Sequence, residues 1–313
     1  MKKLLLLFVV LCSFIGLTAC KAKIDSIKIK EESIPAVINV GDLETALSNI
    51  SLEVVNSKGE STFVNVNKSM ISDADLQKLT TPGTYTVEIT YEGVKTTLTL
   101  NIEDPALYSV KVVYPNGNPV SGGVTVQWCT GETCLLPVAV NANGTAYNDL
   151  EDVNYYIHID NLPKGYTYDP NAYTTNKNNK KVVIELVQLN ATSGEGTSSN
   201  PIVVTEGAFT VSYEGAGQAN MKYYTFTPAT SGTYSIKSLA MDKLALNAID
   251  PYIGFLGTET DMSKIDVSGN LDSKVNINFN HTFTAEANVT YTFIVFVSSA
   301  SKFPASFDII ISK

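Results

Sequence analysis

The sequence predicts an all-β protein: three tandem antiparallel β-sandwich modules that follow an N-terminal export signal. Apolar residues alternate with polar residues over strand-length runs along most of the chain, which is the period of a half-buried strand. Gly, Pro, Asn and Ser recur between these runs, as turns require. The chain beyond the signal is also long enough for three modules of about 80 to 115 residues, and a module of that length can bury its own hydrophobic core.

The export signal occupies residues 1–19. Two lysines precede an apolar run from Leu4 to Ile15, and small residues follow it. Such a segment is a targeting signal and does not belong to the fold. Its end, "LTAC", resembles the lipobox of bacterial lipoproteins, which implies cleavage before Cys20 and acylation of that residue. Residues 20–22 would then be a lipidated tether, and the expected location is extracytoplasmic, anchored by lipid to the bacterial cell membrane.

The charge of the chain argues against one class of partner. Without the signal there are 20 lysines, no arginine and 31 acidic residues, a formal charge of −11. Phosphate backbones are bound by clustered Lys and Arg, and base edges most often by Arg. Nucleic acid is therefore not an expected partner.

The first module is expected over residues 23–103. The stretch "GTYTVEITYEGVKTTLTLNI", residues 83–102, predicts a hairpin that reverses near Glu92-Gly93, because apolar residues alternate on both arms. Ser72 stands three residues before Asp75, the arrangement that begins a helix, so a short helix is expected there. A "GTYTV" strand, a short turn and a final "TTLTLNI" strand resemble the bacterial Ig-like domains of surface proteins.

The second module is expected over residues 105–189. Alternation restarts in "YSVKVVYPNGNPVSGG", residues 108–123, and continues beyond the turns "NANGTAY" and "LPKGY". The order of these strands and turns resembles the prealbumin-like modules found as collagen-adhesin B-type repeats. The resemblance implies a second β-sandwich.

A linker and a third module complete the chain. Residues 190–200, "NATSGEGTSSN", have no apolar periodicity and predict a flexible linker. Residues 201–313 contain further strand-length runs, among them "TYTFIVFV" at 290–297, which is apolar on both faces and predicts a central strand. The order "YYTFTP…SGTYSI…DPYIGF…FDIII" resembles the bacterial pre-peptidase C-terminal domain, which implies a third β-sandwich.

Two cysteines, Cys129 and Cys134, remain after Cys12 leaves with the signal and Cys20 is acylated. If "VTVQWC" and "CLLPV" are the arms of a hairpin, the two face each other, and a disulfide fits such a pair. Free thiols and a metal site are the alternatives. Zinc takes four ligands, whereas this neighbourhood offers two.

Calcium is the one candidate cofactor, since it binds carboxylate oxygens in loops. Asp250 precedes a predicted strand, and Asp266 and Asp272 lie in the turn "DVSGNLD". The alternative is plain turn chemistry, because turns favour these same residue types.

A row of amides is the candidate ligand-binding surface. Asn276, Asn278 and Asn280 alternate with apolar residues, which places three amides on one sheet face. Amides suit sugar hydroxyls, and the alternative is a solvent-facing side without a ligand.

Histidine is scarce in the chain beyond the signal. His158 and His281 are the two available, and neither stands in a hydrolase or zinc motif. We therefore expect no enzyme but a non-catalytic surface lipoprotein for adhesion or for binding an extracellular protein or glycan. The alternatives are a structural spacer or envelope-assembly component, and an accessory binding protein for carbohydrate capture or degradation.

Overall fold

The computed structural model describes residues 22–131, 133–239, 249–259, 261, 278–300 and 302–313. The predicted signal and Cys20 lie outside this part of the chain. The chain divides into two compact units, Met1–Asp104 and Pro105–Lys313. Within the described residues, no helix has the length and apolar character needed to cross a membrane.

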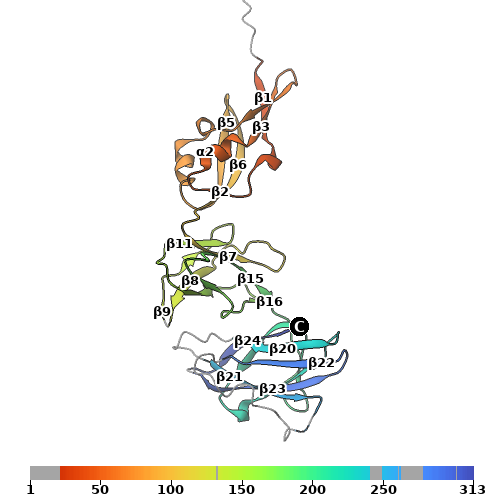
Figure 1. The fold of residues 1–313 in the computed structure, drawn as a ribbon. Coiled ribbons are helices and arrows are strands. Elements are labelled where there is room, and N and C mark those ends of the chain that lie inside the picture. Colours follow the sequence, from red (N-terminus) through yellow and green to blue (C-terminus); the bar gives the residue numbers. More distant parts are fainter. Residues whose placement is uncertain (1–21, 132, 240–248, 260, 262–277, 301) are drawn as a thin grey trace, which may run out of the picture. The chain divides into compact units, whose positions relative to one another are not determined.

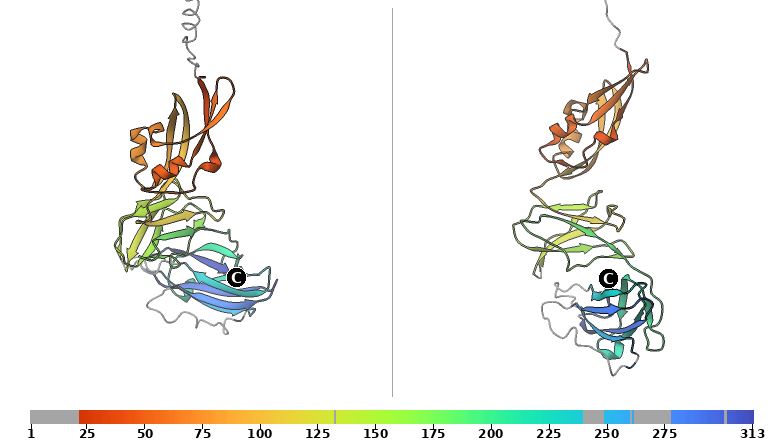
Figure 2. Two further views of the ribbon diagram at one scale, coloured as in Figure 1. Left: turned by 45° about the horizontal axis from the view of Figure 1, so that its top comes forward. Right: turned by 45° about the vertical axis from the view of Figure 1, so that its right-hand side comes forward.

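The unit Met1–Asp104 is built from two three-stranded sheets, β1-β3-β4 and β2-β6-β5 (Figure 1). Its core lies between them and is rich in Ile, Leu and Val. The helices α2 and α3 lie beside the strands and contact β2 and β5 respectively (Figure 2). The strands are β1 (Ile24–Ile29), β2 (Ile38–Asn39), β3 (Ser51–Asn56), β4 (Ser61–Asn65), β5 (Gly83–Tyr91) and β6 (Val94–Glu103). The helices are α2 (Leu43–Ser48), α3 (Asp73–Lys78), and the short 3-10 helices η2 (Glu31–Ser33) and η3 (Lys68–Met70).

Two local predictions in this unit are confirmed. Strands β5 and β6 form the expected hairpin, with Tyr91 opposite Val94. Glu92 (φ 46°) and Gly93 (φ 84°) both take the left-handed backbone that a two-residue hairpin turn requires. Helix α3 begins directly after Ser72, whose side chain accepts a hydrogen bond from the Asp75 N–H.

The first part of the unit Pro105–Lys313 is a sandwich of a sheet β10-β8-β12-β14, with β9 on β8, and a sheet β11-β7-β15. Its core holds Tyr108 and Trp128, both fully buried. A small sheet, β13-β16, completes it. The strands are β7 (Tyr108–Val113), β8 (Thr125–Thr130), β9 (Thr133–Cys134), β10 (Val138–Ala139), β11 (Thr145–Asn148), β12 (Tyr155–Asp160), β13 (Tyr166–Thr167), β14 (Thr174–Thr175), β15 (Lys181–Glu185) and β16 (Val187–Gln188).

The second part of this unit is a sandwich of two four-stranded sheets, β17-β19-β23-β21 and β18-β24-β20-β22. Strand β23 is central, as its sequence predicted: it pairs with β19 and β21, Phe293 lies in the main core, and Phe296 lies in a smaller cluster on the other face. The elements are β17 (Ile202–Val204), β18 (Gly207–Tyr213), η4 (Gln218–Asn220), β19 (Lys222–Phe226), β20 (Gly232–Ser238), β21 (Ile249–Gly257), β22 (Asn280–Ala285), β23 (Tyr291–Ala300) and β24 (Ala305–Ser312).

The protein is therefore an all-β protein of sandwich architecture, with three separate main cores. Most neighbouring strands are antiparallel, but three pairs are parallel: β2 with β6, β7 with β15, and β17 with β19. Alternation along a strand reports which face is buried and not the direction of its partner, so the sequence did not reveal these pairs.

The segment expected as a linker, residues 190–200, is tied by its backbone to the strands that follow it. The Asn190 N–H donates to the Ala208 carbonyl at 2.7 Å, and the Ser193 carbonyl accepts from the Val203 N–H at 2.7 Å. The Tyr223 N–H donates to the Gly196 carbonyl at 2.9 Å. The segment joins two sandwiches, but hydrogen bonds hold it along its length.

Candidate functional site

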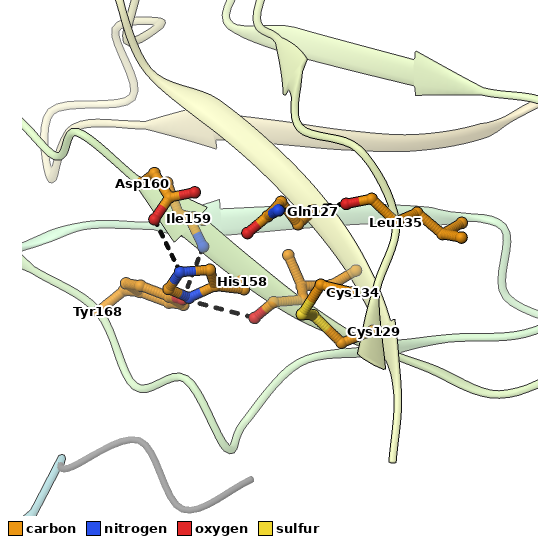
Figure 3. The surroundings of a disulfide bond; sticks show 9 residues. Gln127, Cys129, Cys134, Leu135, His158, Ile159, Asp160 and Tyr168 are labelled. Atoms are coloured by element: carbon orange, nitrogen blue, oxygen red, sulfur yellow. Dashed lines mark hydrogen bonds and ion pairs between the residues drawn. A yellow bond between two sulfur atoms is a disulfide. The ribbon is translucent and has the colours of Figure 1, made fainter. Parts of the chain in front are cut away.

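A disulfide links the two cysteines at the end of the hairpin β8–β9 (Figure 3). Cys129 lies directly opposite Cys134, and Thr130 lies opposite Thr133, so two residues make the reversal. Gly131 has a φ of 57°, the left-handed backbone that such a turn favours. The predicted staple is confirmed, and the alternatives of free thiols and a metal site are not what the structure contains.

Two further hydrogen bonds hold the chain just beyond the disulfide. The Leu135 N–H donates to the Trp128 carbonyl at 2.9 Å, and the Gln127 side chain donates through Nε2 to the Leu135 carbonyl at 3.1 Å. The Trp128 side chain is fully buried in the core of this sandwich, and Cys129 is almost fully buried. The backbone of Leu135 is therefore fixed from both sides by groups that are themselves anchored.

Apolar side chains are exposed at this fixed position. Leu136 is 86% exposed, Leu135 is 40% exposed, and Val153 in the loop opposite is 43% exposed. Single exposed apolar residues are ordinary on protein surfaces, but two adjacent ones beside a restrained backbone, with a third in a neighbouring loop, indicate a binding surface.

A groove of about 690 Å³ lies between the hairpin and the loop before β12. Thr130 and Leu135 line its hairpin side, and residues 149–151 and 153–155 line the other side. Its volume falls within the range of about 300 to 1,000 Å³ that is usual for ligand sites. Segments some twenty residues apart in sequence thus form one concave surface.

The loop side of the groove carries negative charge. Asp149 and Glu151 both line it and are exposed. Asp152, between the lining residues, instead accepts a hydrogen bond from the Tyr108 hydroxyl at 3.1 Å and lies 3.6 Å from the Lys180 ammonium. Burial, with the Asp152 carboxylate next, raises the pKa of Tyr108. Asp152 therefore connects the loop to the core, while the carboxylates of Asp149 and Glu151 line the groove.

The outer face of the same sheet holds one of the two histidines. His158 lies opposite Gln127, and its Nε2 lies 2.8 Å from the Asp160 carboxylate (Figure 3). Its Nδ1 is buried and has no hydrogen-bond partner among the described residues. Below it, the Tyr168 hydroxyl accepts from the Ile159 N–H at 2.9 Å, and burial raises the pKa of this phenol. The His158 side chain is 18% exposed and is paired with the Asp160 carboxylate.

Of the candidate calcium ligands, the structure describes Asp250 alone. Asp250 lies in β21, and its carboxylate accepts a hydrogen bond from the Ser298 hydroxyl. Asp266 and Asp272 lie outside the described residues. Among those residues, no group of three or more His, Cys, Asp or Glu side chains is placed to hold a metal ion.

The amide row is described only in part. Asn280 begins β22 and is exposed. Asn278 precedes the strand, is half-buried, and accepts a hydrogen bond from the Ser238 hydroxyl at 2.8 Å. Asn276 lies outside the described residues. The Asn278 oxygen is therefore engaged within the protein, while Asn280 faces solvent.

The groove was missed from the sequence, although one signal pointed to it. In "CLLPV" two leucines are adjacent, and a strand can bury only one of two neighbouring side chains on a given face. The pair therefore predicts at least one exposed leucine; in the structure residues 135–137 form no strand, and both leucines are exposed. The loop that completes the groove carries no comparable signal.

Comparisons with known proteins find matches among solved structures. No family model matches the chain, and no curated protein matches it. The pre-peptidase C-terminal domain of a Bacillus anthracis collagenase is similar over 39% of this chain and all of that domain, with 16% identity and a TM-score of 0.26. The Bacillus cereus pilin BcpA is similar over 66% of this chain and 59% of that chain, with 11% identity and a TM-score of 0.25. A DUF3823 family protein from Bacteroides ovatus is similar over 65% of this chain and 94% of that one, with 15% identity and a TM-score of 0.22. At these identities and TM-scores the matches assign no family or activity to this chain.

Proposed function

We propose that this chain is a non-catalytic, lipid-anchored surface protein that binds an extracellular partner through the end of the disulfide-bonded hairpin. The observation that carries the proposal is Leu136, which is 86% exposed although the backbone beside it is held by the disulfide and by hydrogen bonds to Leu135. A rigid apolar anchor loses little conformational entropy on binding, so the contact area it contributes is converted efficiently into affinity.

The disulfide also supports an extracytoplasmic location. Disulfides persist in oxidising compartments and are rare in the reducing cytoplasm. This agrees with the "LTAC" motif, from which we propose acylation of Cys20 and attachment to the bacterial cell membrane. Mass spectrometry of the protein purified from membranes tests the anchor. We expect a diacylated or triacylated Cys20 in the natural protein and release of a Cys20→Ala variant from the membrane fraction.

Binding is tested with residues 22–313 on a panel of extracellular matrix proteins and on a glycan array. We expect saturable binding to at least one protein or glycan, and loss of that binding in Leu136→Asp. Val203→Asp is the matched control, because Val203 is also exposed, at 53%, and lies in the other sandwich of the same unit. If no tested molecule binds, the protein is better described as a spacer. If a molecule binds and Leu136→Asp binds it as the natural sequence does, the protein is a binding protein but the hairpin is not its binding site.

A further inference from the structure

The groove beside the disulfide combines an apolar floor with an acidic rim. Leu135 and Val153 line it with apolar side chains, and Leu136, the residue after Leu135, is 86% exposed. Asp149 and Glu151 line the same groove. A ligand that fits must therefore offer apolar contact and positive charge within a few residues of each other.

Lys180, the lysine that lies beside Asp152 of the same loop, contacts groups other than the two rim carboxylates. The Lys180 ammonium donates to the Ala106 carbonyl at 3.1 Å and lies 4.9 Å from the centre of the Tyr108 ring, besides its contact with Asp152. No lysine lines the groove among the residues that the structure describes. The two rim carboxylates can therefore attract a positively charged partner.

The edge of the sheet beside the groove is poorly suited to adding another strand. Strand β9 has β8 as its one partner among the described strands, but Pro137 follows two residues after Leu135 and has no backbone N–H to donate. Recognition at this edge would rest on side chains and charge, and less on a continuous backbone ladder.

We infer that this groove binds a cationic segment of an extracellular protein, in which a leucine-sized side chain packs on Leu135, Leu136 and Val153 while lysine or arginine side chains face Asp149 and Glu151. The inference rests on the proposed function and specifies the chemistry of the partner. The disulfide takes part by fixing Leu135 and Leu136, since Cys134 directly precedes them.

The test measures binding of fluorescent peptides of about ten residues to residues 22–313 by anisotropy. One peptide alternates lysine with leucine, a second alternates lysine with serine, and a third alternates glutamate with leucine. We expect saturable binding of the lysine–leucine peptide, binding at least about tenfold weaker for the lysine–serine peptide, and none for the third. Added salt should weaken the binding, because it screens exposed charges beyond about 8 Å.

Variants locate the site. Leu136→Ser should weaken binding of the lysine–leucine peptide by about tenfold, and Asp149→Asn with Glu151→Gln by about two- to tenfold. The matched controls, Val203→Ser for the apolar change and Glu206→Gln with Glu214→Gln for the charge change, should bind as the natural sequence does. All of these side chains are exposed, so the variants should fold.

Several outcomes would overturn the inference. Absence of binding by the lysine–leucine peptide would do so, as would equal losses in the charge variant and its control, which would mean attraction by net charge alone. If a protein or glycan from the panel binds and Leu136→Asp abolishes that binding, while the lysine–leucine peptide does not bind, the proposed function stands and the cationic partner is wrong. If neither binds, both are wrong.

Discussion

Removing the disulfide should lower the stability of the sandwich that contains the hairpin β8–β9 by a modest amount that can be calculated. Cys129 and Cys134 are five residues apart in sequence, and closing so small a loop contributes about 2 kcal/mol in the chain-entropy model. If the sandwich that contains Trp128 unfolds by itself, this corresponds to a fall in Tm of about 8–16 °C; if all of Pro105–Lys313 unfolds together, the fall is about 4–8 °C.

Differential scanning calorimetry of the natural chain, the chain with a reducing agent, and Cys129→Ala/Cys134→Ala measures this fall. Reduction without substitution is the matched comparison, because alanine also removes the nearly buried sulfur of Cys129. Fluorescence of Trp128, the one tryptophan, assigns the transition to its sandwich. A midpoint that moves by less than about 2 °C on reduction would refute the reasoning and mean that backbone pairing alone holds the hairpin. Thiols that alkylate before reduction would contradict the disulfide itself.

Three further predictions concern the folded modules. Ser72→Ala should lower the stability of Met1–Asp104 by about 1 kcal/mol, because it removes the acceptor of the Asp75 N–H; an unchanged thermal midpoint would contradict the cap. Burial raises the pKa of Tyr168 above its unfolded value of about 10, so the stability from the neutral phenol is complete below about pH 10 and is lost as the pH rises further. Tyr168→Phe should reduce this alkaline loss in thermal melts, and an unaltered pH dependence would count against it. Phe293→Ala should cost about 3–5 kcal/mol in urea unfolding and Phe63→Ala, at a side chain 61% exposed, less than about 0.5 kcal/mol; equal costs would show that the core is misplaced.

Much of the fold followed from local patterns in the sequence. Alternation identified the hairpin of β5 and β6, and an apolar run on both faces identified β23 as a central strand. Ser72 marked the start of α3, and the cysteine spacing marked the disulfide hairpin. These predictions succeeded because each depends on residues within one strand, turn or helix end, where the period of the side chains and the turn chemistry decide the outcome.

The candidate site could not be predicted in the same way. The groove joins the hairpin of β8 and β9 to a loop before β12, and the ion pair of Asp152 with Lys180 holds that loop. Each contact depends on which strands pair and on how the two sheets pack. Sequence spacing does not encode either of these locally.

By itself, then, the sequence determined the fold class, the positions of most strands, and the acidic and arginine-free character of the chain. It predicted a disulfide between Cys129 and Cys134 with free thiols and a metal site as alternatives, and the structure contains the disulfide. The tertiary structure alone decided which exposed leucine lines an acidic groove, which carboxylates line that groove without a lysine among its described lining residues, and which strands run parallel. The physical reason is range: side-chain alternation and turn chemistry act over a few residues, whereas a groove and its charge arise from segments that only packing brings together.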